Sequence, residues 1–174
     1  MPVPILLAAI LLAGMATPAM AQSGRPAPAN PTRIGIFGNW TAASYRDGAT
    51  KVCYAFTRAT RTQPHRDNVI MTVTHRGASR DEVALVPRYN YPRGAPDVTV
   101  TISGTELPFY VGNASAQARD RRAAIAALRT GREAVARGSH PSRIPAIDHF
   151  NLAGFAQAYD AINRECPAPA APRR

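Results

Sequence analysis

The chain has 174 residues and a formal net charge of +10, from 21 Lys and Arg residues against 11 Asp and Glu residues. Hydrophobic residues make up 45% of the sequence, which excludes a wholly disordered chain and is enough for the core of one domain. Beyond the N-terminal region no stretch is long and apolar enough to cross a bilayer, so no transmembrane segment is expected there.

Residues 1–21 are predicted to form a secretory signal peptide. Residues 5–12 are an apolar run of the length of a signal core, and Ala19-Met20-Ala21 provides the small residues of a cleavage site after residue 21. The alternative is an uncleaved anchor or a buried helix, but the run is short and Pro18 interrupts it. We therefore expect an exported protein, periplasmic or secreted, with association at the outer membrane left open.

The two cysteines, Cys53 and Cys166, are predicted to form a disulfide bond. An even number of cysteines in an oxidising compartment favours a bridge. The alternative is a redox or metal-binding thiol, but the sequence has no Cys-x-x-Cys pattern. The bridge would connect an early segment to the end of the domain and constrain the unfolded chain.

Arginine carries nearly all of the positive charge, and Lys51 is the only lysine. A strongly basic exported protein is attracted to anionic lipid head groups, acidic polysaccharides or nucleic acids. The alternative is that the arginine content reflects genome composition and only keeps the protein soluble. Nucleic acid is not expected, because the arginines are spread along the chain without interleaved aromatic residues. We expect a protein partner or an anionic envelope surface, and the sequence defines no oligomeric state.

The folded domain is predicted to span residues 34–167. Residues 22–33 are rich in Pro and Ala and are predicted to be a flexible lead-in, and residues 168–174 a disordered tail. In the first half of the domain, apolar and polar residues alternate in short runs, a pattern typical of strands. The predicted strands are residues 34–44, 51–58, 69–75, 82–86, 97–103 and 107–111. Residues 87–96, with three prolines, are predicted to be a loop.

The second half of the domain changes to helical periodicity. A helix is predicted over residues 116–130, with Ser115 as its cap and Gly131 at its end. Residues 133–137 are predicted to be a short strand, residues 138–147 irregular, and residues 152–165 a last amphipathic helix. The fold class is therefore mainly β with α, an antiparallel β-sandwich-like domain packed with two helices, with an α+β arrangement as the alternative.

Four short motifs, taken in order and spacing, resemble the invasion-associated locus B family of bacterial envelope proteins. They are Phe37-Gly38-Asn39-Trp40, Lys51-Val52-Cys53-Tyr54-Ala55, Asp148-His149-Phe150-Asn151-Leu152-Ala153-Gly154-Phe155 and Cys166-Pro167. The resemblance covers nearly all of the predicted domain. It implies a mostly β, sandwich-type secreted domain in the periplasm or at the outer membrane, and it offers no catalytic residues.

No catalytic, cofactor or metal site is predicted. His140, Asp148 and His149 are candidates for a metal site, and Ser139 or Ser142 with His149 and Asp148 for a hydrolytic triad, but no motif supports either arrangement. The histidines are better explained as loop and surface residues.

Two aromatic features each have a functional and a structural interpretation. Trp40 is expected to be a core residue near the disulfide rather than a ligand-stacking surface. The loop that carries Arg88, Tyr89, Tyr91 and Arg93 has the composition of a contact surface, although an ordinary loop that buries one Tyr is the alternative.

Three functions from different classes follow. The leading hypothesis is a non-enzymatic exported envelope protein that acts by binding a partner or an anionic surface. The alternatives are a small periplasmic hydrolase with an unrecognised site, and a structural or stress-related envelope component.

Overall fold

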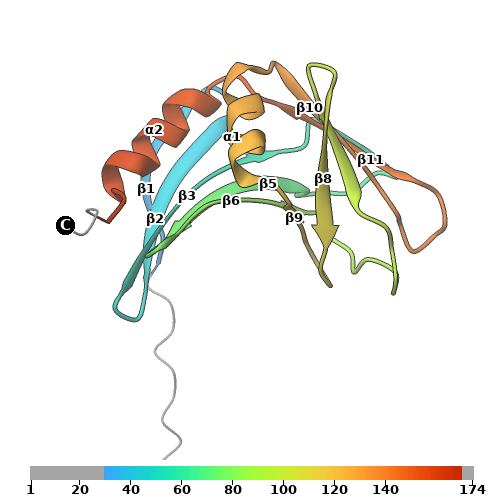
Figure 1. Ribbon diagram of the computed structural model, residues 1–174, viewed down its shortest axis with the longest axis horizontal. Coiled ribbons are helices and arrows are strands. Elements are labelled where there is room, and N and C mark those ends of the chain that lie inside the picture. The colour runs from blue at the N-terminus through green and yellow to red at the C-terminus, as the bar shows by residue number, and fades with distance from the viewer. Residues whose placement is uncertain (1–29, 170–174) are drawn as a thin grey trace, which may run out of the picture.

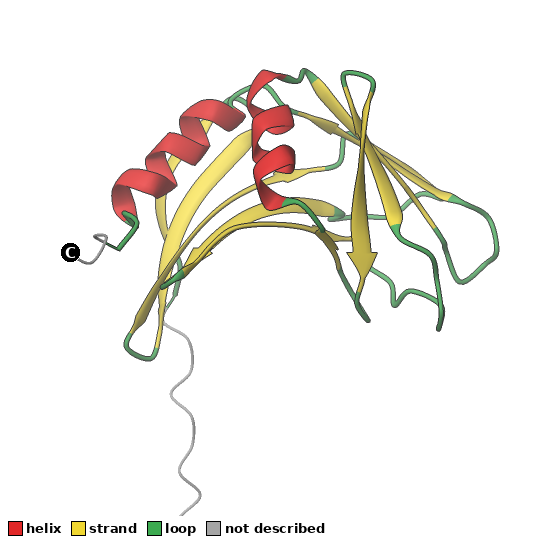
Figure 2. Ribbon diagram, viewed as in Figure 1, coloured by secondary structure: helices red, strands yellow, loops and turns green. Residues whose placement is uncertain are grey.

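The structure is a computed structural model that describes residues 30–169. The predicted signal peptide, residues 22–29 of the lead-in and residues 170–174 of the tail lie outside the described residues. The described part is one antiparallel sheet with two helices (Figures 1 and 2). Its elements are β1 (Thr32–Phe37), β2 (Trp40–Asp47), β3 (Thr50–Arg58), β4 (Arg61–Gln63), β5 (Ile70–Arg76), β6 (Ser79–Val86), β7 (Val98–Ile102), β8 (Thr105–Val111), β9 (Ala116–Ala118), α1 (Arg121–Thr130), β10 (Glu133–Gly138), β11 (Ala146–Asn151) and α2 (Phe155–Glu165).

The sheet folds back on itself so that both of its halves enclose one core. Its strand order is β1-β2-β3-β5-β6-β9-β8-β7-β10-β11-β4. Strand β4 follows β3 after only two residues, and the Thr60 N–H donates to the carbonyl of His149 on β11 at 2.8 Å. Strand β4, the last in the sheet order, therefore lies next to the end of β3, the third.

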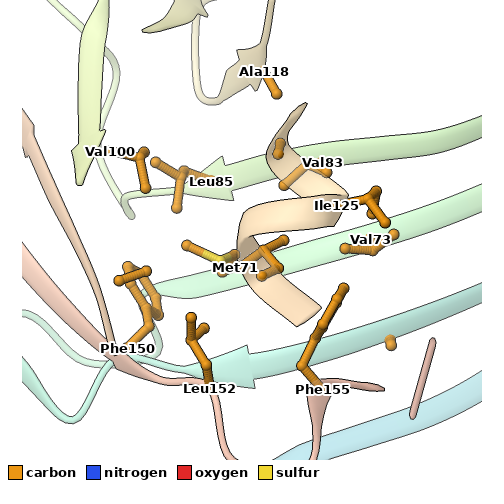
Figure 3. Close-up of a cluster of buried hydrophobic side chains, with 14 of the residues drawn as sticks. Met71, Val73, Val83, Leu85, Val100, Ala118, Ile125, Phe150, Leu152 and Phe155 are labelled. Carbon is orange, nitrogen blue, oxygen red and sulfur yellow. The ribbon is translucent and has the colours of Figure 1, made fainter. Parts of the chain in front are cut away.

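Side chains from both halves of the sheet and from α1 meet in the core. Figure 3 shows Met71 and Leu85 of one half beside Val100 and Phe150 of the other, and α1 packs against β6 and β8. On these strands buried side chains alternate with more exposed ones, as expected for a sheet with one covered face. The predicted fold class, mainly β with antiparallel pairing and two helices, is confirmed.

Helix α2 covers β1, β2 and β3 and is fixed to them in three ways (Figure 1). The rings of Trp40 and Phe155 meet edge to face at 4.8 Å, and both side chains are buried, so Trp40 is the core residue that the sequence predicts. Cys53 and Cys166 form the predicted disulfide, with 6.0 Å between their Cα atoms. Gly154 has φ +93°, and a Cβ there would lie 1.8 Å from the carbonyl oxygen of Phe37, so only glycine permits this approach.

Beneath α2 lies a fully buried histidine, His75, directly across the β3–β5 ladder from Cys53. Its Nδ1 accepts a hydrogen bond from the Asp81 N–H at 3.2 Å, and the Tyr159 hydroxyl of α2 donates to Asp81 Oδ1 at 2.6 Å. Burial lowers the pKa of His75 below its usual range, and the nearby charge of Arg80 lowers it further, while Asp81 opposes them. The native state therefore favours the neutral imidazole.

The predicted helix from residue 116 is wrong in its first part. Ala116–Ala118 forms β9 between β6 and β8, and α1 begins only at Arg121. The cap is Asp120, whose Oδ1 accepts from the Ala123 N–H at 2.9 Å, rather than Ser115. Alanine has no strong strand preference, so only the two neighbouring strands make this segment extended.

The predicted end of the first helix is confirmed, but the reason for its glycine differs, and one strand was missed. Gly131 is the C-terminal cap of α1, although its φ of −75° requires no glycine. This position requires glycine because a Cβ at Gly131 would lie 2.3 Å from Ile102 Cγ2. Strand β11, Ala146–Asn151, was not predicted, because Asp148 and His149 interrupt its apolar alternation.

Replacing both cysteines, as Cys53→Ala with Cys166→Ala, is expected to lower the free energy of unfolding by about 2–5 kcal/mol, because the bridge closes a loop across most of the domain. Urea unfolding of the oxidised protein and the variant measures this. The reduced wild type should match the variant, and an unchanged unfolding midpoint would contradict the expectation.

Stability is expected to decrease as the pH falls from about 7 to about 5, because the unfolded chain takes up the proton that buried His75 resists. The stability that neutral, buried His75 contributes is fully present above the pKa that this histidine has in the unfolded chain. It is lost as the pH falls from that value toward the lower pKa of His75 in the folded protein. His75→Asn retains a hydrogen-bond acceptor and should flatten the dependence in urea unfolding. His65→Asn, at an exposed histidine, should leave it unchanged. Equal slopes for all three proteins would contradict this role of His75.

Candidate functional site

The four predicted contact residues of the β6–β7 loop separate into a buried pair and an exposed pair. Tyr91 is 8% exposed and belongs to the core, and burial raises its pKa well above the usual range. Tyr89 is partly buried and meets Tyr91 edge to face at 5.1 Å. Arg88 and Arg93 are exposed. The tyrosines therefore support the loop, and the arginines are its available cations.

A buried ion pair lies under this loop. Arg66 Nη2 donates to Asp148 Oδ1 at 2.5 Å, and both side chains are less than a tenth exposed. Arg66 Nη1 also donates to the carbonyl of Pro87 at 2.9 Å, and the guanidinium lies 5.1 Å from the centre of the Tyr89 ring. Burial raises the pKa of Asp148, although the Arg66 charge opposes that effect. The pair thus connects β11 to the start of the β6–β7 loop.

The β10–β11 loop forms the opposite wall of the site. Its His140 ring meets Tyr89 edge to face at 4.6 Å, and its Nδ1 lies 2.7 Å from Ser142 Oγ and accepts from the Ser142 N–H at 3.1 Å. The Arg143 N–H donates to the His140 carbonyl at 3.0 Å. Partial burial lowers the pKa of His140, and the charge of Arg66 contributes to the same direction. These contacts fix the turn and seat it on the β6–β7 loop.

Between residues 92–97 and 137–145 lies a cavity of about 580 Å³, which we call the basic cleft and define by Arg93, Arg137, His140 and Arg143. Within the described part of the chain, no carboxylate lies within 4.0 Å of these three guanidinium groups. The Asp97 carboxylate in its lining is held by Arg119 outside it, with Oδ1 accepting from Nη2 at 2.8 Å. The cleft therefore has an excess of positive charge.

The residues weighed for catalysis do not converge. Asp148 points inward to Arg66, whereas the next residue, His149, lies on the other face of β11 with Glu133 at 3.0 Å. Ser142 does touch His140, but through a local turn with no carboxylate to orient the ring. No group of three side chains suited to hold a metal ion occurs among residues 30–169.

Sequence reasoning identified one wall of the cleft but missed the other. Arg93 belongs to the predicted loop, whereas Arg137 and Arg143 come from a segment expected to be a strand end and irregular chain. Arg66, which supports both loops, is one of 21 basic residues and carries no local signal.

Comparison with known proteins shows the fold. No protein-family model matches the chain, and no curated protein matches it either. A solved structure does. Invasion associated protein B from Bartonella henselae superposes with a TM-score of 0.54 at 19% identity, covering 75% of this chain and 96% of that one. The fold is therefore that of a protein named for invasion, in agreement with the fold that the sequence resemblance implies.

No helix within residues 30–169 has the length and hydrophobicity needed to traverse a bilayer.

The ion pair under the loops is expected to be strongly coupled. Arg66→Met should lower the free energy of unfolding by about 3–5 kcal/mol, because it leaves Asp148 charged and buried without a partner. Adding Asp148→Asn removes that charge, so the double variant should be more stable than the single one. Urea unfolding of the single variants and the pair measures the coupling, and strictly additive effects would contradict it.

Proposed function

We propose that this chain is a non-enzymatic exported envelope protein of the invasion-associated locus B type, which acts by binding an anionic partner at the basic cleft. The observation that carries the proposal is that Arg93 of the β6–β7 loop, Arg137 at the end of β10 and Arg143 of the β10–β11 loop line one cavity without a neutralising carboxylate. Like charges gathered in this way repel one another, and an anionic ligand relieves the repulsion.

The rest of the molecule supports this role. The formal net charge of +10 attracts an anionic partner over distance, and the cleft gives that attraction a defined contact point. The disulfide supports an oxidising location. The fold shared with the Bartonella protein supports the family assignment. The buried Arg66–Asp148 pair holds the loops in place before a partner arrives, which lowers the ordering cost of binding.

The test compares two triple variants that remove the same charge. Arg93→Gln, Arg137→Gln and Arg143→Gln remove the cations of the basic cleft. Arg46→Gln, Arg122→Gln and Arg164→Gln remove three exposed arginines that also lack a carboxylate within 4.0 Å among the described residues. Chromatography on immobilised heparin reports binding to a soluble acidic polymer.

The wild type and the control variant should elute at similar salt, and the cleft variant at clearly lower salt. Because both variants lose three charges, a general effect of net charge would shift them equally. An equal shift would show that the basic cleft is not the contact site.

A further inference from the structure

One of the arginines of the basic cleft has an exposed aliphatic neighbour. Ile144 follows Arg143 in the β10–β11 loop, is 54% exposed and lines the cleft. The other large hydrophobic side chains with high exposure in the described part of the chain are elsewhere: Ile36 on the edge strand β1, and Tyr110 on β8. Of these three, Ile144 is the one that lines the basic cleft.

The loop that carries Ile144 is exposed and held in shape. Residues 141–145 are all exposed. The turn is fixed by the hydrogen bonds of Ser142 and Arg143 to His140, and Pro145 restricts the backbone of Ile144 to extended conformations. An exposed isoleucine in a fixed loop is a permanent feature of this surface rather than a side chain that folds away.

The two loops of the basic cleft lie at one end of the molecule. In Figure 1 they are on the right, beyond β8 and β11, whereas α2 and the described C-terminal segment are on the left. A flat surface can therefore approach the loops without meeting the helices.

Resting on the proposed function, we infer that the anionic partner is a phospholipid surface, which this end of the molecule contacts directly. Arg93, Arg137 and Arg143 hold head-group phosphates in the cleft, and Ile144 enters the boundary between head groups and acyl chains. Arginine suits this task because its guanidinium binds phosphate through two parallel hydrogen bonds.

The exposed isoleucine distinguishes a lipid surface from a soluble polyanion. A soluble acidic polymer or peptide interacts with the arginines but leaves Ile144 in water. An anionic membrane provides phosphates for the cations and an apolar layer for the side chain within a few ångströms of each other. Charge and hydrophobicity together therefore favour the membrane surface.

Insertion is tested with a fluorescent reporter. Ile144→Trp should shift its emission to the blue and be quenched by brominated acyl chains when phosphatidylcholine vesicles contain phosphatidylglycerol, but not without it. Ile36→Trp, at 62% exposure on the opposite end of the sheet order, is the matched control and should respond to neither vesicle. Trp40 is fully buried and present in both proteins, so its emission cancels in the comparison.

Affinity is tested by co-sedimentation with the same vesicles. At about 1 kcal/mol per arginine near an anionic surface, the triple cleft variant should bind about 100-fold more weakly. The control triple variant should lose far less. Ile144→Ser should bind several-fold more weakly, with a loss that persists in high salt because it is hydrophobic. Unchanged urea unfolding midpoints confirm that the variants are folded.

The outcomes separate this inference from the proposed function. Binding to heparin through the cleft without binding to anionic vesicles would overturn the lipid assignment and leave the proposed function intact. Binding to neither would overturn both. Equal insertion signals from Ile144→Trp and Ile36→Trp, or equal losses in the two triple variants, would overturn the assignment of this end of the molecule as the contact surface.

Discussion

The covalent and packing attachment of α2 to β1, β2 and β3 is the constraint on which the rest of the structure depends. The sheet has a large apolar face on these strands, and an amphipathic helix must cover it. Trp40 packs on Phe155 at one end of the helix, and the Cys53–Cys166 bridge fixes the other end. Because both ends are fixed, the helix keeps the core closed and allows His75 to remain neutral beneath it.

The basic cleft depends on a second constraint, the buried Arg66–Asp148 pair. Tyr91 anchors the β6–β7 loop in the core, but the β10–β11 loop buries no large apolar side chain, so hydrogen bonding, ring contacts and charge must hold the two loops together. Arg66 connects β11, the carbonyl of Pro87 and the Tyr89 ring, and Tyr89 in turn contacts His140. A pair of buried charges contributes little net stability, but it defines one arrangement of the groups around it. Here that arrangement places three exposed arginines around one cavity.

The sequence predicted the parts of this fold that depend on local pattern. The alternation in β5 and β7, the helical spacing of α2, the buried Trp40 and the disulfide all follow from residue type and spacing. Prediction from sequence failed where pairing with distant segments decides the local conformation. The segment Ala116–Ala118 is a strand only because two others flank it, and β11 has a charged residue on its inner face that only Arg66 makes tolerable. For the same reason the cleft could be predicted only in part, since its second wall begins at the end of β10.

The return of β4 to β11 has a consequence for how the chain folds. Arg61–Gln63 pairs with residues 147–149, so two segments far apart in sequence must meet before the sheet is complete. Contacts between such distant segments slow folding, because a long loop has to be ordered before any pairing compensates for it. A nascent or truncated chain that lacks β11 would leave β4 and β10 with exposed backbone edges, where a strand from another molecule could add. This protein is therefore vulnerable to aggregation until nearly all of its domain is present.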